Sequence, residues 1–186
     1  MRARAVAGLA VRFGGLIALL AAIWTLAVVN LVTGYALLPW FGLVPRTASG
    51  FDGIAFMPLL HGSLGHAAAN TPPLLVLGAA VTLTAREVAL RATAVIVVLG
   101  GGAVWLLGAR AIHVGASGLI FGWFGFLLTH GLLERRPAPA LAAIAVALIY
   151  GTMIWGVLPG RPGVSWEAHL FGALAGVAAA VLLRRR

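Results

Sequence analysis

The chain has 186 residues, of which 62% are hydrophobic and 9% are charged, and its mean hydropathy is +1.06. This leaves too little polar surface for a water-soluble globule and predicts a single all-α membrane domain over residues 1–186, with the lipid bilayer as its surroundings. The net charge of +9 comes from arginines scattered between apolar segments, which excludes the continuous basic face of a nucleic-acid-binding protein. The lack of cysteine excludes disulfides and thiolate chemistry.

Six apolar segments bounded by Arg, Pro or Gly predict a polytopic bundle of six membrane-spanning helices. The first segment is longer than the apolar part of a signal peptide, so we expect it to be a retained span. The linker at 35–63 carries Trp40, Phe41 and Phe56 and is predicted to lie in the outer membrane interface. The expected helix limits are about 13–34, 64–84, 88–108, 115–133, 139–158 and 165–183.

The arginines predict the orientation of these spans. Ten of the thirteen basic residues fall at one set of segment ends and three at the other. Because positive residues concentrate on the cytoplasmic side, the richer side and both termini are expected to be cytoplasmic, which fits an even number of crossings. The ten are Arg2, Arg4, Arg12, Arg86, Arg91, Arg135, Arg136, Arg184, Arg185 and Arg186, and the three are Arg46, Arg110 and Arg161.

The segment at 64–84 begins with two polar side chains on one face. His66 and Asn70 are four residues apart, so both project the same way near the outer end of the helix. Their N–H groups suit the stabilisation of a negatively charged oxygen, and an interhelical polar clasp is the alternative. Pro72 and Pro73 follow inside the same predicted helix, where a bend would shift both side chains.

The segments at 115–133 and 165–183 each contain a GxxxG spacing, which lets two helix backbones approach closely. Ser117 lies just before the first of these spacings, and His169 shares a face with the second. If the glycine faces meet, His169 is brought toward Ser117. The glycines concerned are Gly118 and Gly122, and Gly172 and Gly176.

Ser117 and His169 have the chemistry of a nucleophile and its general base. Four acids occur in the whole chain. Glu87 and Glu134 are expected at the opposite side of the membrane, Asp52 is in the outer linker, and Glu167 is turned away from His169 by its spacing of two residues. The sequence therefore predicts a Ser-His dyad without a third, acidic member.

Three motifs occur in a fixed order: HGSLGHAAAN at 61–70, GASG at 115–118 and AHLFGALAG at 168–176. Together they resemble the rhomboid intramembrane serine proteases of the minimal six-helix bacterial type. The resemblance implies a protein of the cell membrane that cleaves transmembrane segments of other membrane proteins, which would enter beside the fifth helix, with the site open to the outer side.

The resemblance also implies roles for individual residues. Ser117 would attack the scissile carbonyl and His169 would act as base and then acid, while His66, Asn70 and the backbone N–H of Ser117 hold the oxyanion. Phe121 stands where relatives often stack a tyrosine on the histidine. Phe121, His61 and Gly115 are thus expected to support the site, and neither a metal nor a cofactor is expected.

Two alternatives remain open at the sequence level. His61, His66, His113 and His169 are predicted at one depth, so they could bind a metal in a transporter or a metal-dependent hydrolase. The second alternative is a rhomboid-like protein that binds membrane clients without cleaving them.

Overall fold

The computed structural model describes residues 2–134, 136–160 and 162–184, with side chains from residue 12 onward. Arg135, Arg161, Arg185 and Arg186, which entered the orientation argument, lie outside the described residues, as do the side chains of Arg2 and Arg4. The helices are α1 (Arg2–Val32), α2 (Leu37–Phe41), α3 (Gly53–Phe56), η1 (Met57–Leu59), α4 (Leu64–Thr84), α5 (Ala89–Leu107), α6 (Ser117–Leu133), α7 (Pro137–Tyr150), η2 (Gly151–Val157) and α8 (Trp166–Leu182).

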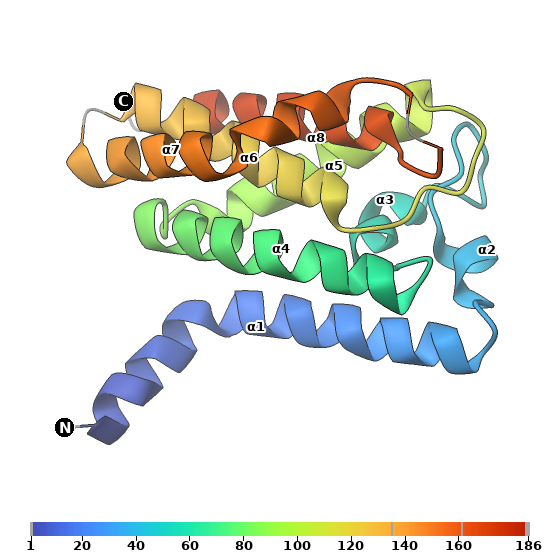
Figure 1. Ribbon diagram of the computed structural model, residues 1–186, viewed down its shortest axis with the longest axis horizontal. Helices are drawn as coiled ribbons and strands as arrows, with labels where there is room; N and C mark the ends of the chain where they lie inside the picture. The colour runs from blue at the N-terminus through green and yellow to red at the C-terminus, as the bar shows by residue number, and fades with distance from the viewer. Residues whose placement is uncertain (1, 135, 161, 185–186) are drawn as a thin grey trace.

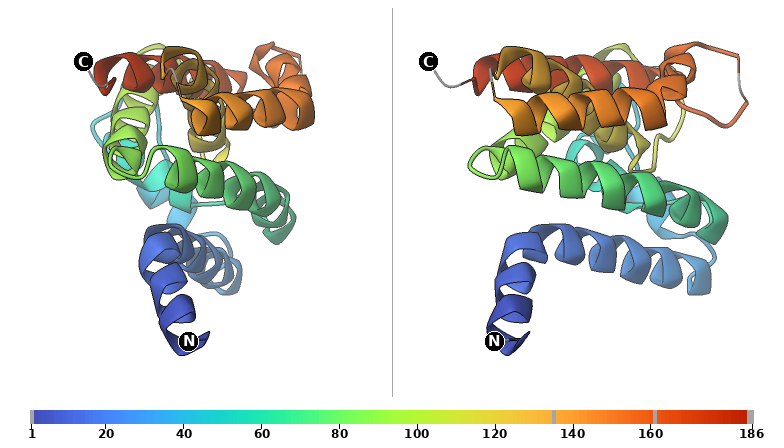
Figure 2. Two further views of the ribbon diagram at one scale, coloured as in Figure 1. Left: turned by 90° about the vertical axis from the view of Figure 1, so that its left-hand side faces the viewer. Right: turned by 60° about the vertical axis from the view of Figure 1, so that its left-hand side comes forward.

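The long helices lie side by side, with α1 at one edge of the bundle next to α4 (Figure 1). The start of α1 and the end of α8 lie at the same end of the bundle (Figures 1 and 2). Within the described residues, four helical segments are long and apolar enough to span a membrane: Arg12–Val32, Leu64–Thr84, Ala89–Leu107 and Pro137–Val157. The helices α6 and α8 have 17 residues each, the lower end of the length that crosses a bilayer core.

The limits of α4, α5, α6 and α8 agree with the predicted ones to within about two residues, the usual scatter of helix ends. Three expectations need correction. The first helix begins earlier than residue 13 because its Ala- and Arg-rich start is itself helix-forming, and it ends where Gly34 and Tyr35 take positive φ angles of 64° and 65°. The linker at 35–63 contains the short helices α2, α3 and η1.

The third correction concerns the predicted helix at 139–158. The α-helix ends at Tyr150 and continues as a 3-10 helix over Gly151–Val157, in which the last turns are tighter. Glycines at both ends of this stretch, Gly151 and Gly156, remove the side chains that would hold a regular α-helix in place. The change of winding matters because Gly156 contacts the histidine of the predicted dyad.

The outer linker is anchored on the end of α5. The guanidinium of Arg46 donates hydrogen bonds to the carbonyl oxygens of Leu106 and Gly108, at 3.0 and 2.9 Å, where helix carbonyls lack partners. The indole N–H of Trp105 donates to the Thr47 carbonyl at 3.0 Å. Trp40 is 76% exposed, as expected for a side chain placed against lipid.

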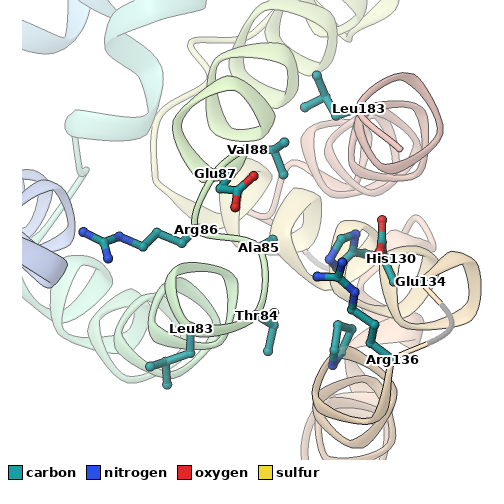
Figure 3. A pocket seen from close by; sticks show the side chains of 11 residues that line it. Leu83, Thr84, Ala85, Arg86, Glu87, Val88, His130, Glu134, Arg136 and Leu183 are labelled. Atoms are coloured by element: carbon teal, nitrogen blue, oxygen red, sulfur yellow. The ribbon is translucent and has the colours of Figure 1, made fainter. Parts of the chain in front are cut away.

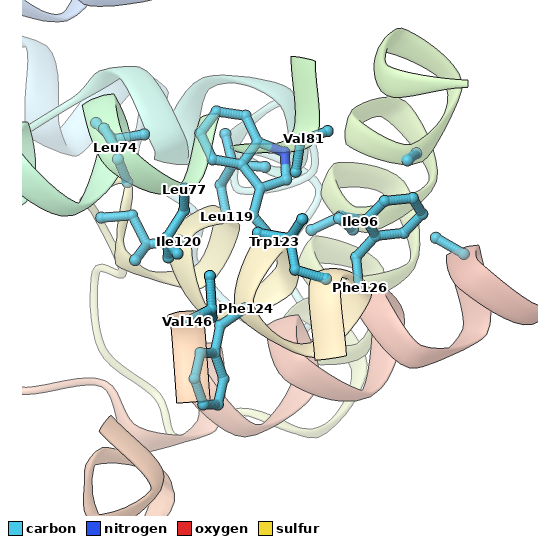
Figure 4. Close-up of a cluster of buried hydrophobic side chains, with 14 of the residues drawn as sticks. Leu74, Leu77, Val81, Ile96, Leu119, Ile120, Trp123, Phe124, Phe126 and Val146 are labelled. Carbon is cyan, nitrogen blue, oxygen red and sulfur yellow. The ribbon is translucent and has the colours of Figure 1, made fainter. Parts of the chain in front are cut away.

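The core surrounds α6, which is buried on nearly all of its faces and packs against α4, α5, α7 and α8. A helix that is apolar all round fits this central place. Figure 4 shows its bulky side chains meeting those of α4, α5 and α7. The buried side chains labelled there are Leu74, Leu77, Val81, Ile96, Leu119, Ile120, Trp123, Phe124, Phe126 and Val146.

Candidate active site

Ser117 is the first residue of α6, at the end of the bundle opposite the chain termini, and it is half-buried. The turn before it depends on Gly115, whose φ of 116° is a conformation that residues with a Cβ rarely adopt. The N–H of Gly115 donates to the Met57 carbonyl at 2.9 Å. The start of α6 has no side-chain cap, so its first backbone N–H groups point outward with the positive end of the helix dipole.

The two GxxxG faces do meet, as expected. A Cβ atom on Gly172 would overlap the Gly118 carbonyl, and one on Gly176 would overlap the Gly122 carbonyl. A Cβ on Gly118 would in turn lie 3.2 Å from the carbonyl oxygen of Ala168, the residue before His169. The backbones of α6 and α8 are therefore in direct contact beside Ser117 and His169.

His169 is buried and its ring is held on two sides. The ring of Phe121, one turn after Ser117, stacks on it with centroids 4.2 Å apart and planes 5° from parallel. His169 Nδ1 lies 2.9 Å from the carbonyl oxygen of Gly156. A carbonyl can only accept, so Nδ1 carries the proton and Nε2 keeps the lone pair that a general base needs.

Glu167 is not the hydrogen-bond partner of His169. Its carboxylate accepts the backbone N–H of Ala109 at 3.2 Å and so attaches the loop after α5 to the start of α8. The Gly156 carbonyl thus occupies the place that a carboxylate has in a triad, which agrees with a dyad. In the described part of the chain no hydrogen bond joins Ser117 and His169, and such bonds often tighten only when substrate is bound.

His66 lies against the loop that leads to Ser117. A Cβ on Gly115 would come within 2.8 Å of His66 Nε2, so only glycine leaves room for this ring. The Asn70 amide is buried and donates one of its protons to the His66 carbonyl at 3.1 Å, which leaves its second proton for another acceptor. The prolines Pro72 and Pro73 do not interrupt α4, which is continuous over Leu64–Thr84.

His61 connects the site to α1. Its ring is 1% exposed and meets the His66 ring edge to face at 4.9 Å, while its Nε2 accepts the N–H of Ala116 at 3.4 Å. Asn30 of α1 donates to the His61 carbonyl at 3.1 Å. Nδ1 is buried without a hydrogen-bond partner among the described residues.

Burial lowers the pKa of His61 to about 4, and the neighbouring His66 lowers it further. The Leu59 carbonyl, which lies near His61 without a well-aligned hydrogen bond, raises that pKa by less. His61 is therefore neutral at pH 7.

Comparison with known proteins agrees with this arrangement. The model of the Rhomboid domain matches residues 48–186, which include every motif discussed above. The chain belongs to the rhomboid family. Rhomboid proteins generally are intramembrane serine proteases, and this one is accordingly a multi-pass membrane protein.

Mycobacterial relatives match over most of the chain. An uncharacterised protein of Mycobacterium tuberculosis and one of Mycobacterium bovis are each 45% identical over 151 residues, which cover 76% of this chain and 63% of the relative. An uncharacterised protein of Mycobacterium leprae is 45% identical over 140 residues, or 70% of this chain and 55% of that protein. This rhomboid chain thus spans less than two thirds of the length of these relatives.

His113 has a structural part in the rhomboid site. Its Nε2 donates to the Ala109 carbonyl at 2.9 Å, and its Nδ1 lies 2.7 Å from the Ser165 hydroxyl, which also accepts the N–H of Ala168 as the cap of α8. Both ring nitrogens are thereby used. Over the described residues, no group of three or more His, Asp or Glu side chains is arranged to hold a metal ion, so the four histidines do not form one metal cluster.

A cavity of about 430 Å³ lies at the same end of this rhomboid bundle, between the loop after α5 and the loop before α8. His66, His113 and Ser165 contribute to its wall. The cavity therefore offers a polar path for water to the edge of the site.

Sequence reasoning missed three supports of the rhomboid site. The Gly156 carbonyl carries no side-chain signal, since any residue has a carbonyl and only the 3-10 turn directs this one at His169. Ser63 and Ser165 cap α4 and α8 by accepting the N–H groups of His66 and Ala168, at 3.0 and 3.2 Å. A serine three residues before a helical position is a known capping signal that would have revealed both.

Proposed function

We propose that this rhomboid chain is a serine endopeptidase that cleaves transmembrane segments of membrane proteins, with Ser117 as nucleophile and His169 as general base. The observation that carries the proposal is the way His169 is held. Its ring stacks on Phe121, a residue one helical turn after Ser117, and its Nδ1 is hydrogen-bonded to the Gly156 carbonyl. Among the described residues His169 Nε2 makes no hydrogen bond, so it is available as a general base.

In the proposed mechanism, Ser117 Oγ attacks the scissile carbonyl and its proton passes to His169 Nε2. The Gly156 carbonyl keeps the ring in the tautomer required and stabilises the imidazolium by accepting from Nδ1–H. His169 then protonates the leaving amine. Water enters through the outer cavity, gives a proton to His169 and attacks the acyl-enzyme ester. The bond from the acyl carbon to Ser117 Oγ then breaks, and His169 returns the proton to Oγ as the carboxylic acid leaves.

The oxyanion would be held by the backbone N–H of Ser117, by a ring N–H of His66 and by the second amide proton of Asn70. The uncapped start of α6 adds the favourable end of a helix dipole. Removal of one such donor typically costs on the order of 10²-fold in kcat. We therefore expect His66→Ala and Asn70→Ala each to slow cleavage by about that factor, measured as the initial rate in vesicles.

The proposed topology has six crossings, both termini in the cytoplasm of the cell and the site toward the outer side. Partners are transmembrane substrates and the bilayer, and the chemistry uses no metal or cofactor. Because the chain has no cysteine, single cysteines can report the sides. Ser49→Cys in the outer linker should react with an impermeant maleimide from outside, and Ala138→Cys in the first turn of α7 should not. The reverse pattern would overturn the orientation.

The function is tested with full-length chain in vesicles and a reporter substrate with one transmembrane segment. Ser117→Ala should lower cleavage by on the order of 10³-fold or more, and so should His169→Ala. The matched control is Ser49→Ala, which removes an exposed serine of the outer linker and should leave the rate unchanged. Cleavage that survives Ser117→Ala and stops with a chelator would support the metal mechanism, and capture of the reporter without cleavage would support client binding.

A further inference from the structure

A groove of about 510 Å³ lies between α1 and the pair α4 and α5, away from Ser117. Leu16 and Leu19 line its α1 side, and Gly78 and Val81 line its α4 side. The Trp123 ring of α6 forms part of its wall, with its N–H donated to the Thr93 hydroxyl at 3.0 Å. Thr93 and Thr82 donate their own protons to helix carbonyls, so the groove presents mainly apolar atoms.

One end of the groove carries two positive charges. Arg12 and Arg86 both line it, and both side chains are exposed. Arg12 lies four residues before Leu16 and seven before Leu19, so all three share one face of α1. Figure 3 shows Arg86 extending away from His130 and toward the ribbon of α1. Both arginines therefore lie at the end of the groove nearer the start of α1 and the end of α4.

The apolar groove with two arginines at one end is complementary to a phospholipid. The apolar walls and the volume suit an acyl chain, and the two arginines suit a phosphate group at the depth of the headgroups. The groove lies at the edge of the bundle, since only α1 closes it on that side (Figures 1 and 2). Lipid can thus enter it directly from the bilayer.

We propose that this groove is a binding site for one anionic phospholipid, which places an acyl chain between α1 and α4 and its phosphate between Arg12 and Arg86. The bound lipid acts as part of the α1–α4 interface. Neither Ser117 nor His169 lines the groove, whose one contribution from α6 is Trp123.

Native mass spectrometry of the full chain in detergent tests the proposal, with phosphatidylglycerol as probe and phosphatidylcholine as the uncharged comparison. We expect one tightly held phosphatidylglycerol, and about fivefold weaker binding for each of Arg12→Gln and Arg86→Gln. The double variant should bind both lipids alike. Gly15→Leu, which adds a side chain in open space beside the groove, should weaken both lipids.

The matched control is Arg91→Gln, because Arg91 lies at the same end of the bundle but outside the groove and donates to the Glu87 carbonyl at 3.4 Å. It should leave lipid affinity unchanged. Equal losses in Arg91→Gln would indicate diffuse surface attraction and overturn the site. So would displacement of the lipid by inorganic phosphate, or wild-type affinity in Gly15→Leu.

Folding of each variant is checked by its unfolding temperature and by its elution as one species in detergent, neither of which depends on the reactivity of Ser117. Should a glutamine variant fail this check, Arg86→Lys replaces it, and retention of the phosphatidylglycerol preference is then the expected result. Loss of that preference in a folded Arg86→Lys variant would show that charge at this end of the groove does not select the lipid, and would overturn the proposal.

Discussion

The interface between α6 and α8 and the interface between α1 and α4 both combine apolar side chains with glycine, yet the helices approach very differently. At α6 and α8 the backbones touch, and a Cβ on Gly172 or Gly176 would overlap a carbonyl of the partner helix. At α1 and α4, a Cβ on Gly78 would lie 2.7 Å from the end of the Leu16 side chain and 2.9 Å from the Trp123 ring of α6, and one on Gly15 would meet nothing within 4 Å. The second interface holds the 510 Å³ groove.

The difference shows what the spacing of small residues determines. Glycines four apart on both helices form two flat faces, so contact is continuous and the side chains nearby are held to a narrow range of positions. Isolated glycines leave gaps between larger side chains instead. The proposed dyad lies on the closely packed interface, where placement must be accurate, and the groove lies on the open one.

The largest expected effect comes from breaking the close interface. In Gly176→Val, the new side chain would overlap the Gly122 carbonyl, and backbone cannot move aside easily. We expect the free energy of unfolding to fall by about 3 kcal/mol or more, measured by denaturant unfolding in detergent. We also expect fluorophosphonate labelling of Ser117 to be lost. The control is Gly102→Ala on α5, where a Cβ meets nothing within 4 Å, so the variant should be neutral or slightly stabilised.

The second effect concerns His61, which joins the two interfaces through Asn30 of α1 and Ala116 before α6. Because its folded pKa of about 4 is below the unfolded value of 6.5, the unfolded chain binds the proton more readily in between. The contribution of His61 to the free energy of unfolding should therefore be fully present above pH 6.5. It should be lost as the pH falls toward 4, which lowers the free energy of unfolding by up to about 3 kcal/mol.

Unfolding curves at a series of pH values measure this loss. Glutamine at this position cannot be protonated in this pH range. In His61→Gln, the free energy of unfolding should therefore change less with pH between 6.5 and 4 than it does in the wild type. An unchanged slope in that variant would show that His61 does not cause the acid sensitivity.

A third and smaller effect is expected at the turn before Ser117. Gly115→Ala combines a strained φ with a contact between the new Cβ and the His66 ring. The strain costs about 2 kcal/mol, and the displaced ring should slow cleavage more than the lost stability explains. Rates compared at temperatures where wild type and variant are both folded separate the two contributions. Equal rates there would mean that His66 has no part in the reaction.

The fourth effect tests the stacked ring. Phe121→Leu keeps apolar volume but removes the face that supports His169, and we expect cleavage to slow by about fivefold, in line with about 1 kcal/mol for a stacked pair. Phe121→Tyr retains the face and should keep the wild-type rate. If both variants behave alike, the stack does not position the histidine.

The smallest effect lies on the open interface. Gly15→Ala adds a methyl group in open space within α1, so we expect it to raise stability by about 0.5 kcal/mol or leave it unchanged. Denaturant unfolding in detergent measures this. A loss comparable to that of Gly176→Val would mean that the two interfaces are packed alike.

The sequence predicted most of the helical framework because apolar segments of spanning length have few other uses in a chain this hydrophobic. It also predicted that the glycine faces of α6 and α8 meet, since paired glycine spacings constrain which faces touch. The predicted depth of Ser117 and His169 in the membrane would not by itself have indicated which helix faces meet.

Other features of the structure could not be predicted, because nothing in the nearby sequence indicates them. The Gly156 carbonyl reaches His169 only because α7 changes to a 3-10 helix, and a carbonyl is common to all residues. The His61 carbonyl accepts a hydrogen bond from Asn30, 31 residues earlier in the chain, and no periodicity connects the two residues. The groove was also unpredictable, since the face of α1 that lines it is as apolar as the rest of the helix.

The central claim is that Ser117 is a nucleophile activated by His169. It is tested most directly by reacting the full chain in vesicles with a fluorophosphonate and mapping the adduct by mass spectrometry. We predict an adduct on Ser117 that is lost in His169→Ala and retained in Ser49→Ala. No adduct at any pH where a histidine can act as base, or an adduct on another serine, would contradict the account.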